Sequence, residues 1–495
     1  MHLTFDNTYI ALPDHFYSRV DPEPVSKPET IKANHRLARQ LGFDPEWLQS
    51  KEGAEFIVGN RILEGSEPIA MVYAGHQFGN WVPRLGDGRA LLLGEVVDPD
   101  GQRFDLHLKG SGRTPYSRGG DGRAPLGPVL REYLLAEAMH TLGVPTSRAL
   151  AAARTGDPVY RDGRLPGAVL VRVAKSHIRI GTFEYFAARG DAEAIHRLVS
   201  YTIERHYPGL PQSSPIELLR AFSGRLAGLV ARWQLLGFIH GVMNTDNMLL
   251  SGETIDYGPC AFMNEYDSET VFSSIDRYGR YAYGNQPAIA RWNLSRLAQA
   301  LVITTGTPDD ESTDEQEHFL QQAQALIDEF PETFRSAYLQ GMARKLGLGD
   351  YRDDYLPLIE DLLEVMAETR SDYTITFRGL MTELGPGNES LEAQDELFSL
   401  DPAFDPWLTR WQAHLDECPL NTQESYDLMS RQNPVFIPRN YLVEEALQQA
   451  LDNDETAFHK LHEVLKAPFT YRAEDHRFAL PPAPEKRVQA TFCGT

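Results

Sequence analysis

Cysteine and long apolar runs are both scarce in this chain of 495 residues. The three cysteines, Cys260, Cys418 and Cys493, form an odd set without metal-ligand spacing, which excludes a disulfide-rich scaffold and is typical of a reducing compartment. No uncharged apolar run approaches about 18 residues, and residues 1–6 lack the basic and apolar regions of a secretory signal. We therefore expect a cytoplasmic protein that has no membrane partner.

Positive charge is also in short supply. The chain has 47 Lys and Arg against 70 Asp and Glu, which gives a formal net charge of -23. Because nucleic acid binding requires a basic face, we expect no nucleic acid partner. Hydrophobic residues at 42% and charged residues at 24% are close to globular averages, so the chain should fold around a large core.

Several elements are predicted by local patterns. Two apolar strands at 90–97 and 103–109 flank an Asp-Pro-Asp-Gly turn, and a further strand is expected at 168–173. A helix is predicted over 126–142, where leucines recur on one face before a Gly and a Pro. Ser214, followed by Pro and then Glu, predicts the start of another buried helix.

Lys109 ends the second predicted strand, and Glu132 lies inside the next predicted helix. In a protein kinase, a strand lysine binds nucleotide phosphates and a glutamate on the following helix holds that lysine in place. Taken singly, each residue is more typical of a solvated surface side chain. The pair therefore gains meaning only from the motifs that follow it.

Residues 240–247 lie between the buried helix and a short hairpin expected over 247–256, and an Asp-Tyr-Gly motif begins at Asp256. This order matches a kinase catalytic loop that ends in a metal-binding Asn and is followed by Asp-Phe-Gly. Oxygen ligands of this kind suit Mg²⁺, which also retains waters and substrate phosphates. We predict that Asn247 and Asp256 are metal ligands.

One position departs from the kinase pattern. The kinase base lies five residues before the metal-binding Asn, and here that position is Val242. Asp246 is the nearest carboxylate that could take its place. Because Asp246 adjoins Asn247, it could instead support the metal from outside the ligand set; we predict that it is the general base.

Glycine and arginine supply the remaining candidates for phosphate binding. A Gly-rich turn at 84–89 can present backbone N–H groups and a guanidinium to a phosphate, although such a turn alone is a weak signal. Arg172 and Arg179 lie on or near strands that should border the same cleft, and guanidinium groups suit polyphosphate oxygens. A structural salt bridge is the more common role of a single strand arginine.

Together these patterns predict an α+β, protein-kinase-like two-lobed fold. The expected segments are an N-terminal arm at 1–60, a β-rich N-lobe with nucleotide-binding loops at 61–176, a helical C-lobe with the catalytic loop and metal site at 177–305, and a helical extension with a C-terminal tail at 306–495.

Two rival functions stay open at the level of these motifs. The first is a kinase that transfers the γ-phosphoryl group, against which Val242 argues. The second is a non-catalytic pseudokinase that binds ATP as a scaffold. A complete set of phosphate and metal residues argues against the scaffold, because it has no need for them.

The motifs closely resemble those of the selenoprotein O (SelO/YdiU) family, from about residue 5 to the C-terminus. They lie at 73–79, 84–89, 108–118, 120–123, 240–247 and 256–259. Members of that family have a kinase-like fold but bind ATP in a reversed orientation, with the α-phosphorus facing the acceptor. The resemblance implies AMP transfer from ATP to Ser, Thr or Tyr hydroxyls of proteins, with UMP transfer from UTP and Mn²⁺ as a further option.

The resemblance also implies roles for individual residues. Asp246 would accept the proton, and Asn247 and Asp256 would hold Mg²⁺ or Mn²⁺. The expected nucleotide contacts are Gly86, Gly88, Arg89, Lys109, Asp121, Gly122, Arg172, Arg179 and Asp256. The absence of an aspartate at position 242 is itself typical of the family.

Two cysteines suggest redox control. Cys493 lies where many eukaryotic members of the family carry a selenocysteine, and Cys260 follows the Asp-Tyr-Gly motif. A reversible disulfide between them would tether the tail across the segment after Asp256. Two reduced thiols are the alternative.

Overall fold

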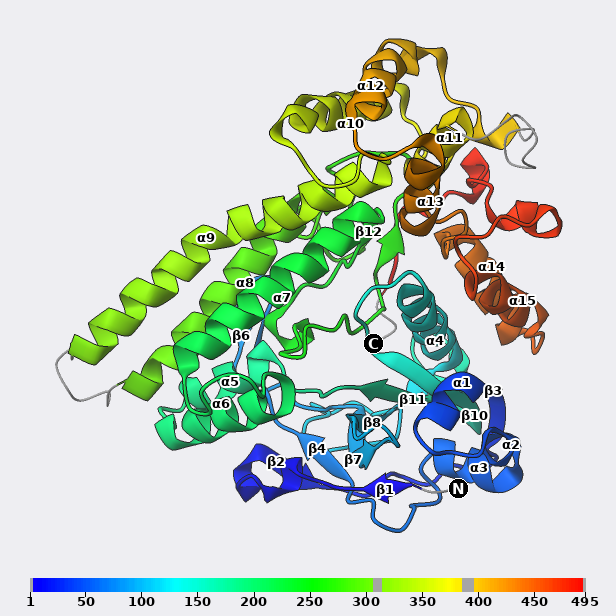
Figure 1. Cartoon of the computed structure of the whole chain (residues 1–495). Helices are drawn as coiled ribbons and strands as arrows, with labels where there is room; N and C mark the ends of the chain where they lie inside the picture. The colour runs from blue at the N-terminus through cyan, green and yellow to red at the C-terminus, as the bar shows by residue number, and fades with distance from the viewer. Residues whose placement is uncertain (1–2, 306–313, 385–395, 493–495) are drawn as a thin grey trace.

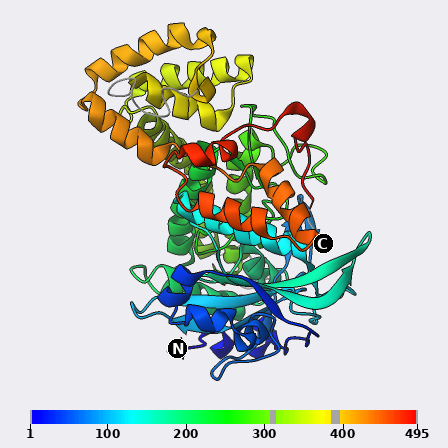
Figure 2. The same cartoon turned by 90° about the vertical axis from the view of Figure 1, so that its right-hand side faces the viewer.

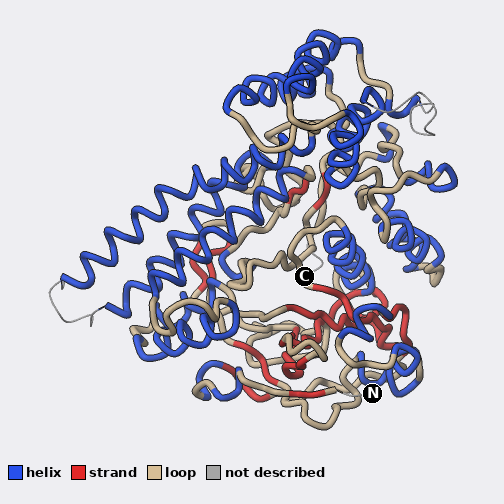
Figure 3. The backbone as a smooth tube through the Cα atoms, in the orientation of Figure 1, coloured by secondary structure: helices blue, strands red, loops and turns tan. Residues whose placement is uncertain are grey.

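The computed structural model describes residues 3–305, 314–384 and 396–492. It is a mixed α+β structure in which an antiparallel sheet lies below a layer of long helices, as drawn in Figure 1. Figure 3 shows that most strands lie in the lower part of the molecule and that helices make up most of the rest. No helix in these described ranges is long and apolar enough to cross a membrane.

The main sheet follows the order β2-β4-β7-β8-β11-β10-β3, with β1 paired to β7 and β9 paired to β11. Its strands are β1 (Thr4–Phe5), β2 (Tyr17–Arg19), β3 (Glu29–Ala33), β4 (Ile69–Met71), β7 (Ala90–Val97), β8 (Arg103–Lys109), β9 (Ala124–Pro125), β10 (Arg148–Tyr160) and β11 (Arg164–Ala174). Two small hairpins pair β5 (Gly75–Gln77) with β6 (Asn80–Val82), and β12 (Phe238–Ile239) with β13 (Ala261–Phe262).

The strands expected at 90–97 and 103–109 are confirmed as β7 and β8, and the strand expected at 168–173 lies within β11. Residues 1–60 add β1, β2 and β3 to the sheet, together with three short helices, α1 (His35–Gln40), α2 (Pro45–Gln49) and α3 (Lys51–Ile57). This first segment is therefore part of the sheet layer, and β3 forms one edge of the sheet.

Helix α4 (Leu126–Thr141) follows the predicted range of 126–142 and packs against β10 and β11. Leucines on its buried face join a core with the alanines of the two strands. Gly143, with φ +80°, adopts the left-handed conformation just past the helix end, which favours glycine. The helix places Glu132 and Glu137 at fixed positions above the sheet.

The helical layer contains α5 (Ile180–Ala187), α6 (Ala192–His206), α7 (Pro215–Leu235), α8 (Gln286–Leu301) and α9 (Asp314–Lys345). Helix α7 begins as predicted, because the Ser214 hydroxyl accepts a hydrogen bond from the Glu217 backbone N–H at 3.4 Å. It packs against α8 and α9, and the three run side by side in Figure 1. The loop that follows α7 carries residues 240–256.

The hairpin expected over 247–256 is reduced to a single bridge between Met248 and Thr254. Pairing with distant segments replaces the local ladder, since Leu249 bridges to Arg179 and Thr254 to Thr146. The small hairpin expected here is therefore present in a minimal form, and the long-range bridges tie the loop to the start of α5 and to the chain before β10.

The C-terminal helices divide into two groups. Helices α10 (Leu356–Thr369), α11 (Tyr373–Leu384), α12 (Asp405–Glu417) and α13 (Thr422–Gln432) share a separate core with the end of α9. Helices α14 (Asn440–Leu451) and α15 (Thr456–Leu465) instead return to pack against α4, as Figure 2 shows. The last two helices therefore cover the sheet region rather than extend away from it.

Candidate active site

A cavity of about 290 Å³ is lined by strands of the sheet, by the loops at 84–89 and 116–123, and by the loop after α7. All eleven residues predicted to bind nucleotide or metal or to accept a proton line it: Gly86, Gly88, Arg89, Lys109, Asp121, Gly122, Arg172, Arg179, Asp246, Asn247 and Asp256. We call this cavity the cleft. Its residues come from segments more than 100 positions apart, so only the fold brings them together.

Lys109 and Glu132 form the ion pair expected from their order in the sequence. The Lys109 ammonium contacts the Glu132 carboxylate directly, and Arg172 Nη1 donates to the other Glu132 oxygen at 3.0 Å. Burial alone would raise the pKa of Glu132, but Lys109 and Arg172 outweigh it and lower that pKa. Glu132 therefore stays ionised and fixes two cations at the cleft.

Asp256 and Asn247 lie side by side, with Asn247 Nδ2 3.4 Å from an Asp256 carboxylate oxygen. The Asn247 amide nitrogen also donates to the Val242 carbonyl at 3.0 Å, which leaves its amide oxygen available as a ligand. Lys109 Nζ is 3.4 Å from Asp256. Burial favours a higher pKa for Asp256, yet Lys109, Arg89 and Arg172 hold it well below its usual range. A carboxylate and an amide oxygen of this kind fit a Mg²⁺ or Mn²⁺ ion that also binds phosphates.

Asp246 lies on a short turn of 3-10 helix, Thr245–Asn247, and is buried. Gln77 Nε2 donates to its Oδ2 at 3.3 Å, whereas Oδ1 has no hydrogen-bond partner among the described residues. Burial raises the pKa of Asp246 to about 6, although Arg179 opposes that shift. A carboxylate with a raised pKa and one unused oxygen can accept a proton near neutral pH. Gly75 faces it, and a Cβ there would lie 2.6 Å from Oδ1.

Arg179 connects the loop at 240–247 to the glycine-rich turn. Its Nη1 donates to the Asp246 backbone carbonyl at 2.7 Å, and its Nη2 lies 3.7 Å from Asp87. The guanidinium stacks over the Tyr73 ring, with 4.3 Å from its carbon to the ring centroid. Arg179 is thus held in place before any ligand binds.

The turn that contains Gly86 and Gly88 packs against the loop at 114–117. Gly86 has φ +71°, and a Cβ there would lie 2.4 Å from the Tyr116 ring. A Cβ at Gly88 would meet the Tyr116 carbonyl at 2.7 Å. Both glycines are therefore required by close packing, which also leaves their backbone open to the cleft.

Asp121 and Gly122 line the cleft beside Arg161. The Asp121 carboxylate accepts two hydrogen bonds from Arg161, at 2.9 and 3.1 Å, and a third from the Arg123 backbone at 2.9 Å. The hydrogen bond from Arg161 is the main cause of the lowered pKa of Asp121. Asp121 therefore orders this loop and positions Arg161 at the cleft.

Comparisons with known proteins give the family of this chain. The family described as "Protein adenylyltransferase SelO" matches residues 1–466. The chain belongs to the SelO family. It is 52% identical over 498 residues to "Protein nucleotidyltransferase YdiU" of Rhodopseudomonas palustris (strain BisB5), covering 100% of both chains. Proteins of the same name from Bradyrhizobium diazoefficiens and Rhizobium meliloti (strain 1021) are 53% and 52% identical, with 100% and 99% of both chains covered.

In this SelO-family chain, a network below the cleft was not predicted from the sequence. Arg172 Nη2 donates to His107 Nδ1 at 3.0 Å, and His107 Nε2 lies 3.3 Å from Asp87. Burial, and then Arg172, lower the pKa of His107, so the ring is neutral and its Nε2–H faces Asp87. His107 and Arg172 lie on two different strands and Asp87 lies in the turn before β7, and no local pattern links the three.

A second group of hydrogen-bonded side chains holds the loop at 240–247 in place. Glu184, on α5, accepts hydrogen bonds from the Thr245 hydroxyl and from His76 Nδ1, the latter at 2.6 Å. The His76 backbone N–H donates to the Thr245 hydroxyl at 2.7 Å. The 73–79 motif contained His76 and Gln77, but it carried no assigned role. The structure shows that the β5–β6 hairpin touches the loop that holds Asp246.

Of the two cysteines predicted to pair, Cys260 follows the Asp-Tyr-Gly motif by two positions and is buried. Cys493 lies outside the described residues. The nearby Thr491 hydroxyl donates to the Pro259 carbonyl, and its backbone N–H to the Phe272 carbonyl at 2.7 Å. The described end of the tail thus lies beside Cys260. The disulfide itself stays a prediction.

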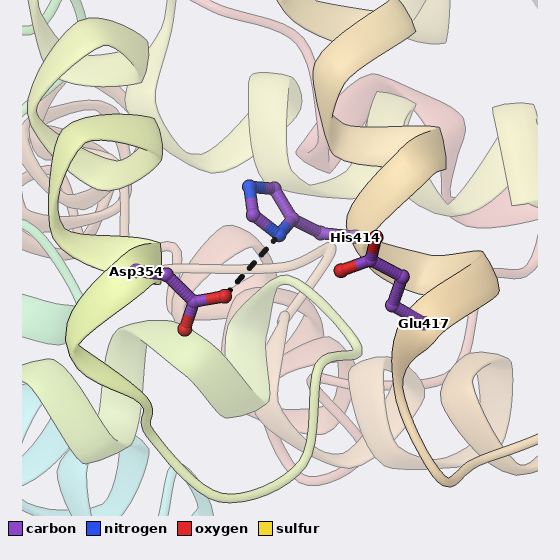
Figure 4. Close-up of side chains that lie close together, drawn as sticks. All are labelled: Asp354, His414 and Glu417. Atoms are coloured by element: carbon purple, nitrogen blue, oxygen red, sulfur yellow. Dashed lines mark ion pairs between the residues drawn. The ribbon is translucent and has the colours of Figure 1, made fainter.

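A separate cluster lies in the extension, far from the cleft in the sequence. Asp354 faces His414 across 4.0 Å, and Glu417 lies one turn further along α12, as Figure 4 shows. Arg352 already donates to both Asp354 oxygens, at 3.0 and 2.5 Å. The cluster is therefore explained as an exposed ion-pair network that joins α12 to the start of α10.

Proposed function

We propose that this SelO-family protein transfers AMP from ATP to Ser, Thr or Tyr hydroxyls of other proteins and releases pyrophosphate. The observation that carries the proposal is Asp246, a buried carboxylate with one unused oxygen, beside Asn247 and Asp256. Position 242, where a protein kinase has its base, is a buried valine. The proton acceptor thus comes from a different place in the loop.

The proposal includes a protein-kinase-like arrangement of two lobes. The sheet with α4 would be the N-lobe, formed by residues 61–176 with three strands added by the arm at 1–60, and the layer of α5 to α8 would be the C-lobe at 177–305. The remaining helices would be the extension at 306–495. The Lys109–Glu132 pair between strand and helix, and the cleft between sheet and helical layer, support this assignment.

In the proposed reaction the acceptor hydroxyl oxygen attacks the α-phosphorus. The bond from the α-phosphorus to the bridging oxygen breaks, and pyrophosphate leaves with that oxygen. Asp246 accepts the hydroxyl proton. Lys109, Arg172 and Arg179 neutralise the charge that develops on the phosphates. A Mg²⁺ or Mn²⁺ ion bound by Asn247 and Asp256 would supply further positive charge to the same oxygens.

Parallel reactions with α-labelled and γ-labelled ATP test the proposal. The full chain is incubated with each nucleotide, a protein acceptor and Mg²⁺ or Mn²⁺, with reductant present. We expect protein-bound label from the α position alone. Label from the γ position alone would establish a kinase instead, and absence of label from either would favour a scaffold. A parallel arm with α-labelled UTP compares UMP transfer with AMP transfer.

Two variants distinguish a role of Asp256 in metal binding from a nonspecific effect of removing a carboxylate charge. Asp256→Asn removes a charge in the cleft and should abolish transfer while the protein stays folded. Asp416→Asn makes the same change at an exposed site of α12 and should leave transfer at the wild-type level. Equal activity in both variants would contradict the role of Asp256.

A further inference from the structure

A second cavity, larger than the cleft, lies on another side of α4. Its volume is about 720 Å³, and α1, β3, α4 and α15 provide most of its lining. These elements lie together on one side of the molecule in Figure 1. We call it the rear cavity. None of the residues predicted for nucleotide, metal or proton transfer lines it.

The rear cavity is basic, although the chain as a whole carries a net charge of -23. Five Lys or Arg residues line it against two glutamates. The basic residues are Lys32, Arg36, Arg39, Arg148 and Lys466. Such a concentration of cations in an acidic protein is an unfavourable arrangement unless an anion offsets it.

The two glutamates pair with three of the five cations, namely Arg148, Lys466 and Lys32. Glu137 is fully occupied, since it accepts two hydrogen bonds from Arg148, at 2.9 and 2.7 Å, one from the Ala149 backbone at 2.9 Å and one from Asn34 at 2.7 Å. Glu463 is mostly exposed and pairs with Lys466 at 2.6 Å. Both carboxylates are therefore already used by neighbouring groups.

Arg36 and Arg39 are the two cations of the rear cavity that neither glutamate binds. Both lie on α1 at the mouth of the rear cavity and are exposed. Within the described ranges, neither guanidinium has an acidic side chain within ion-pair distance. They are spaced three residues apart on the helix, so their side chains project from the same face. They form a pair of cations that can both reach one ligand.

The lining of the rear cavity also contains a buried polar atom that makes no hydrogen bond. His462, on α15, is 6% exposed, and its Nδ1 has no hydrogen-bond partner among the described residues, although a Glu463 oxygen lies 3.8 Å away. Burial, together with Lys32 and Lys466, lowers the pKa of His462 to about 4. Burial also lowers the pKa of Lys32. Groups held in this state gain hydrogen bonding and lose repulsion when an anion enters.

We propose that the rear cavity binds a small organic phosphate. Arg36, Arg39 and Lys466 would contact the phosphate group, and His462 would contact the part of the ligand that lies deepest in the cavity. Its volume falls in the range of small-molecule sites, which is about 300–1,000 Å³. Walls from four separate elements favour a compact ligand over a protein surface. Guanidinium groups also bind phosphate oxygens in pairs.

The same helix connects this site with the cleft. Glu132 and Glu137 are five residues apart on α4, which turns about 100° per residue, so the two side chains point about 140° apart. A ligand in the rear cavity would join α4 to α15 and α1. It would thereby stabilise the position of the helix that carries Glu132.

Thermal unfolding of the full chain tests the proposal. The probes are inorganic phosphate and phosphoenolpyruvate, with sodium chloride at equal ionic strength as the reference. Wild type is compared with Arg36→Gln/Arg39→Gln and with Arg89→Gln, which removes a cation from the cleft instead. We expect both probes to raise Tm in wild type and in Arg89→Gln, and to leave Tm unchanged in the double variant.

Calorimetric titration with phosphoenolpyruvate gives the same comparison as an affinity. The double variant should bind at least about tenfold more weakly than wild type, because two charge-assisted contacts are lost. Lys466→Gln provides an independent exposed substitution if the double variant fails to fold. Loss of binding in Arg89→Gln but not in the double variant would assign the probe to the cleft and overturn the proposal. Absence of binding to wild type would overturn it too.

Discussion

The cleft and the rear cavity are two basic cavities on different sides of one helix, and they differ in whether their cations are paired with carboxylates. In the cleft, Lys109 is held by Glu132 and Asp256. In the rear cavity, Arg36 and Arg39 have no such carboxylate in the described part of the chain. Preorganised charges suit catalysis, because they require no rearrangement when charge develops in the reaction. Exposed cations without a carboxylate partner suit capture of a ligand that supplies the missing anion.

Helix α4 makes the comparison direct, because each cavity depends on one of its glutamates. Glu132 binds two cations that line the cleft, whereas Glu137 binds Arg148, the backbone N–H of Ala149 and the side chain of Asn34. Substitutions at these sites should therefore separate chemistry from stability. The predictions below follow from this difference, beginning with the largest effect.

Asp246→Asn should lower kcat by roughly 10²–10⁴-fold, the usual range for removal of a general base. Wild-type activity should also depend on pH, and it should fall as Asp246 becomes protonated. Its pKa is raised to about 6 by burial, so the basic form is lost as pH falls through that value. Initial rates of α-label transfer, measured from about pH 5 to pH 8, should decline on the acid side near pH 6.

The variant itself provides the control for this profile. Asn keeps the shape of Asp246 but cannot titrate, so the small residual rate should lose the acid limb. Circular dichroism and Tm establish that the variant is folded. A wild-type rate in Asp246→Asn, or an acid limb that persists in it, would assign the proton acceptor to another group.

Glu137→Gln should lower the free energy of unfolding by about 3 kcal/mol, because it leaves the Arg148 charge without its buried partner. The rate per folded molecule should stay close to that of wild type, since Glu137 does not line the cleft. Urea unfolding and label transfer at low temperature measure the two quantities separately. A large fall in rate with unchanged stability would remove the distinction between the two glutamates.

Glu132→Gln should reduce activity strongly and stability only a little, which is the reverse of Glu137→Gln. Loss of the carboxylate releases Lys109 and Arg172, and we expect kcat/KM for ATP to fall by roughly 30-fold, equivalent to about 2 kcal/mol. The stability loss should be smaller than for Glu137→Gln, because Lys109 keeps Asp256 and Arg172 keeps His107 as neighbours. Unchanged kcat/KM would mean that the ion pair is structural only.

Local patterns were sufficient for several elements, whereas the residues of the cleft were named from local motifs together with the family resemblance. The strands β7 and β8 and helix α4 follow from turn chemistry and from periodicity within a few residues. The cleft residues are found in short motifs whose Gly, Asp and Asn are unusual in ordinary helices and strands. Their chemical types and order could therefore be recognised before their positions in space were known.

The rear cavity and the network under the cleft could not be predicted in this way. The rear cavity combines residues near 32–49, 137–148 and 459–466, and no local pattern indicates that α15 returns to α4. The His107 contact with Arg172 likewise joins two strands that pair at a distance. Such features depend on tertiary packing, so their residues look like ordinary surface or core positions in the sequence.

Gln77→Ala should have the smallest effect, and it tests how finely the cleft is preorganised. Gln77 donates a hydrogen bond to Asp246 at 3.3 Å and thereby lowers the pKa of that carboxyl. Its loss should shift the acid limb of the rate profile to higher pH, with activity near pH 6 falling about threefold and activity near pH 8 unchanged. A matched change at Gln49→Ala, beside the rear cavity, should leave the profile where it is. If both variants keep the wild-type profile, the proton affinity of Asp246 is set by its burial and by Arg179 rather than by the hairpin above it.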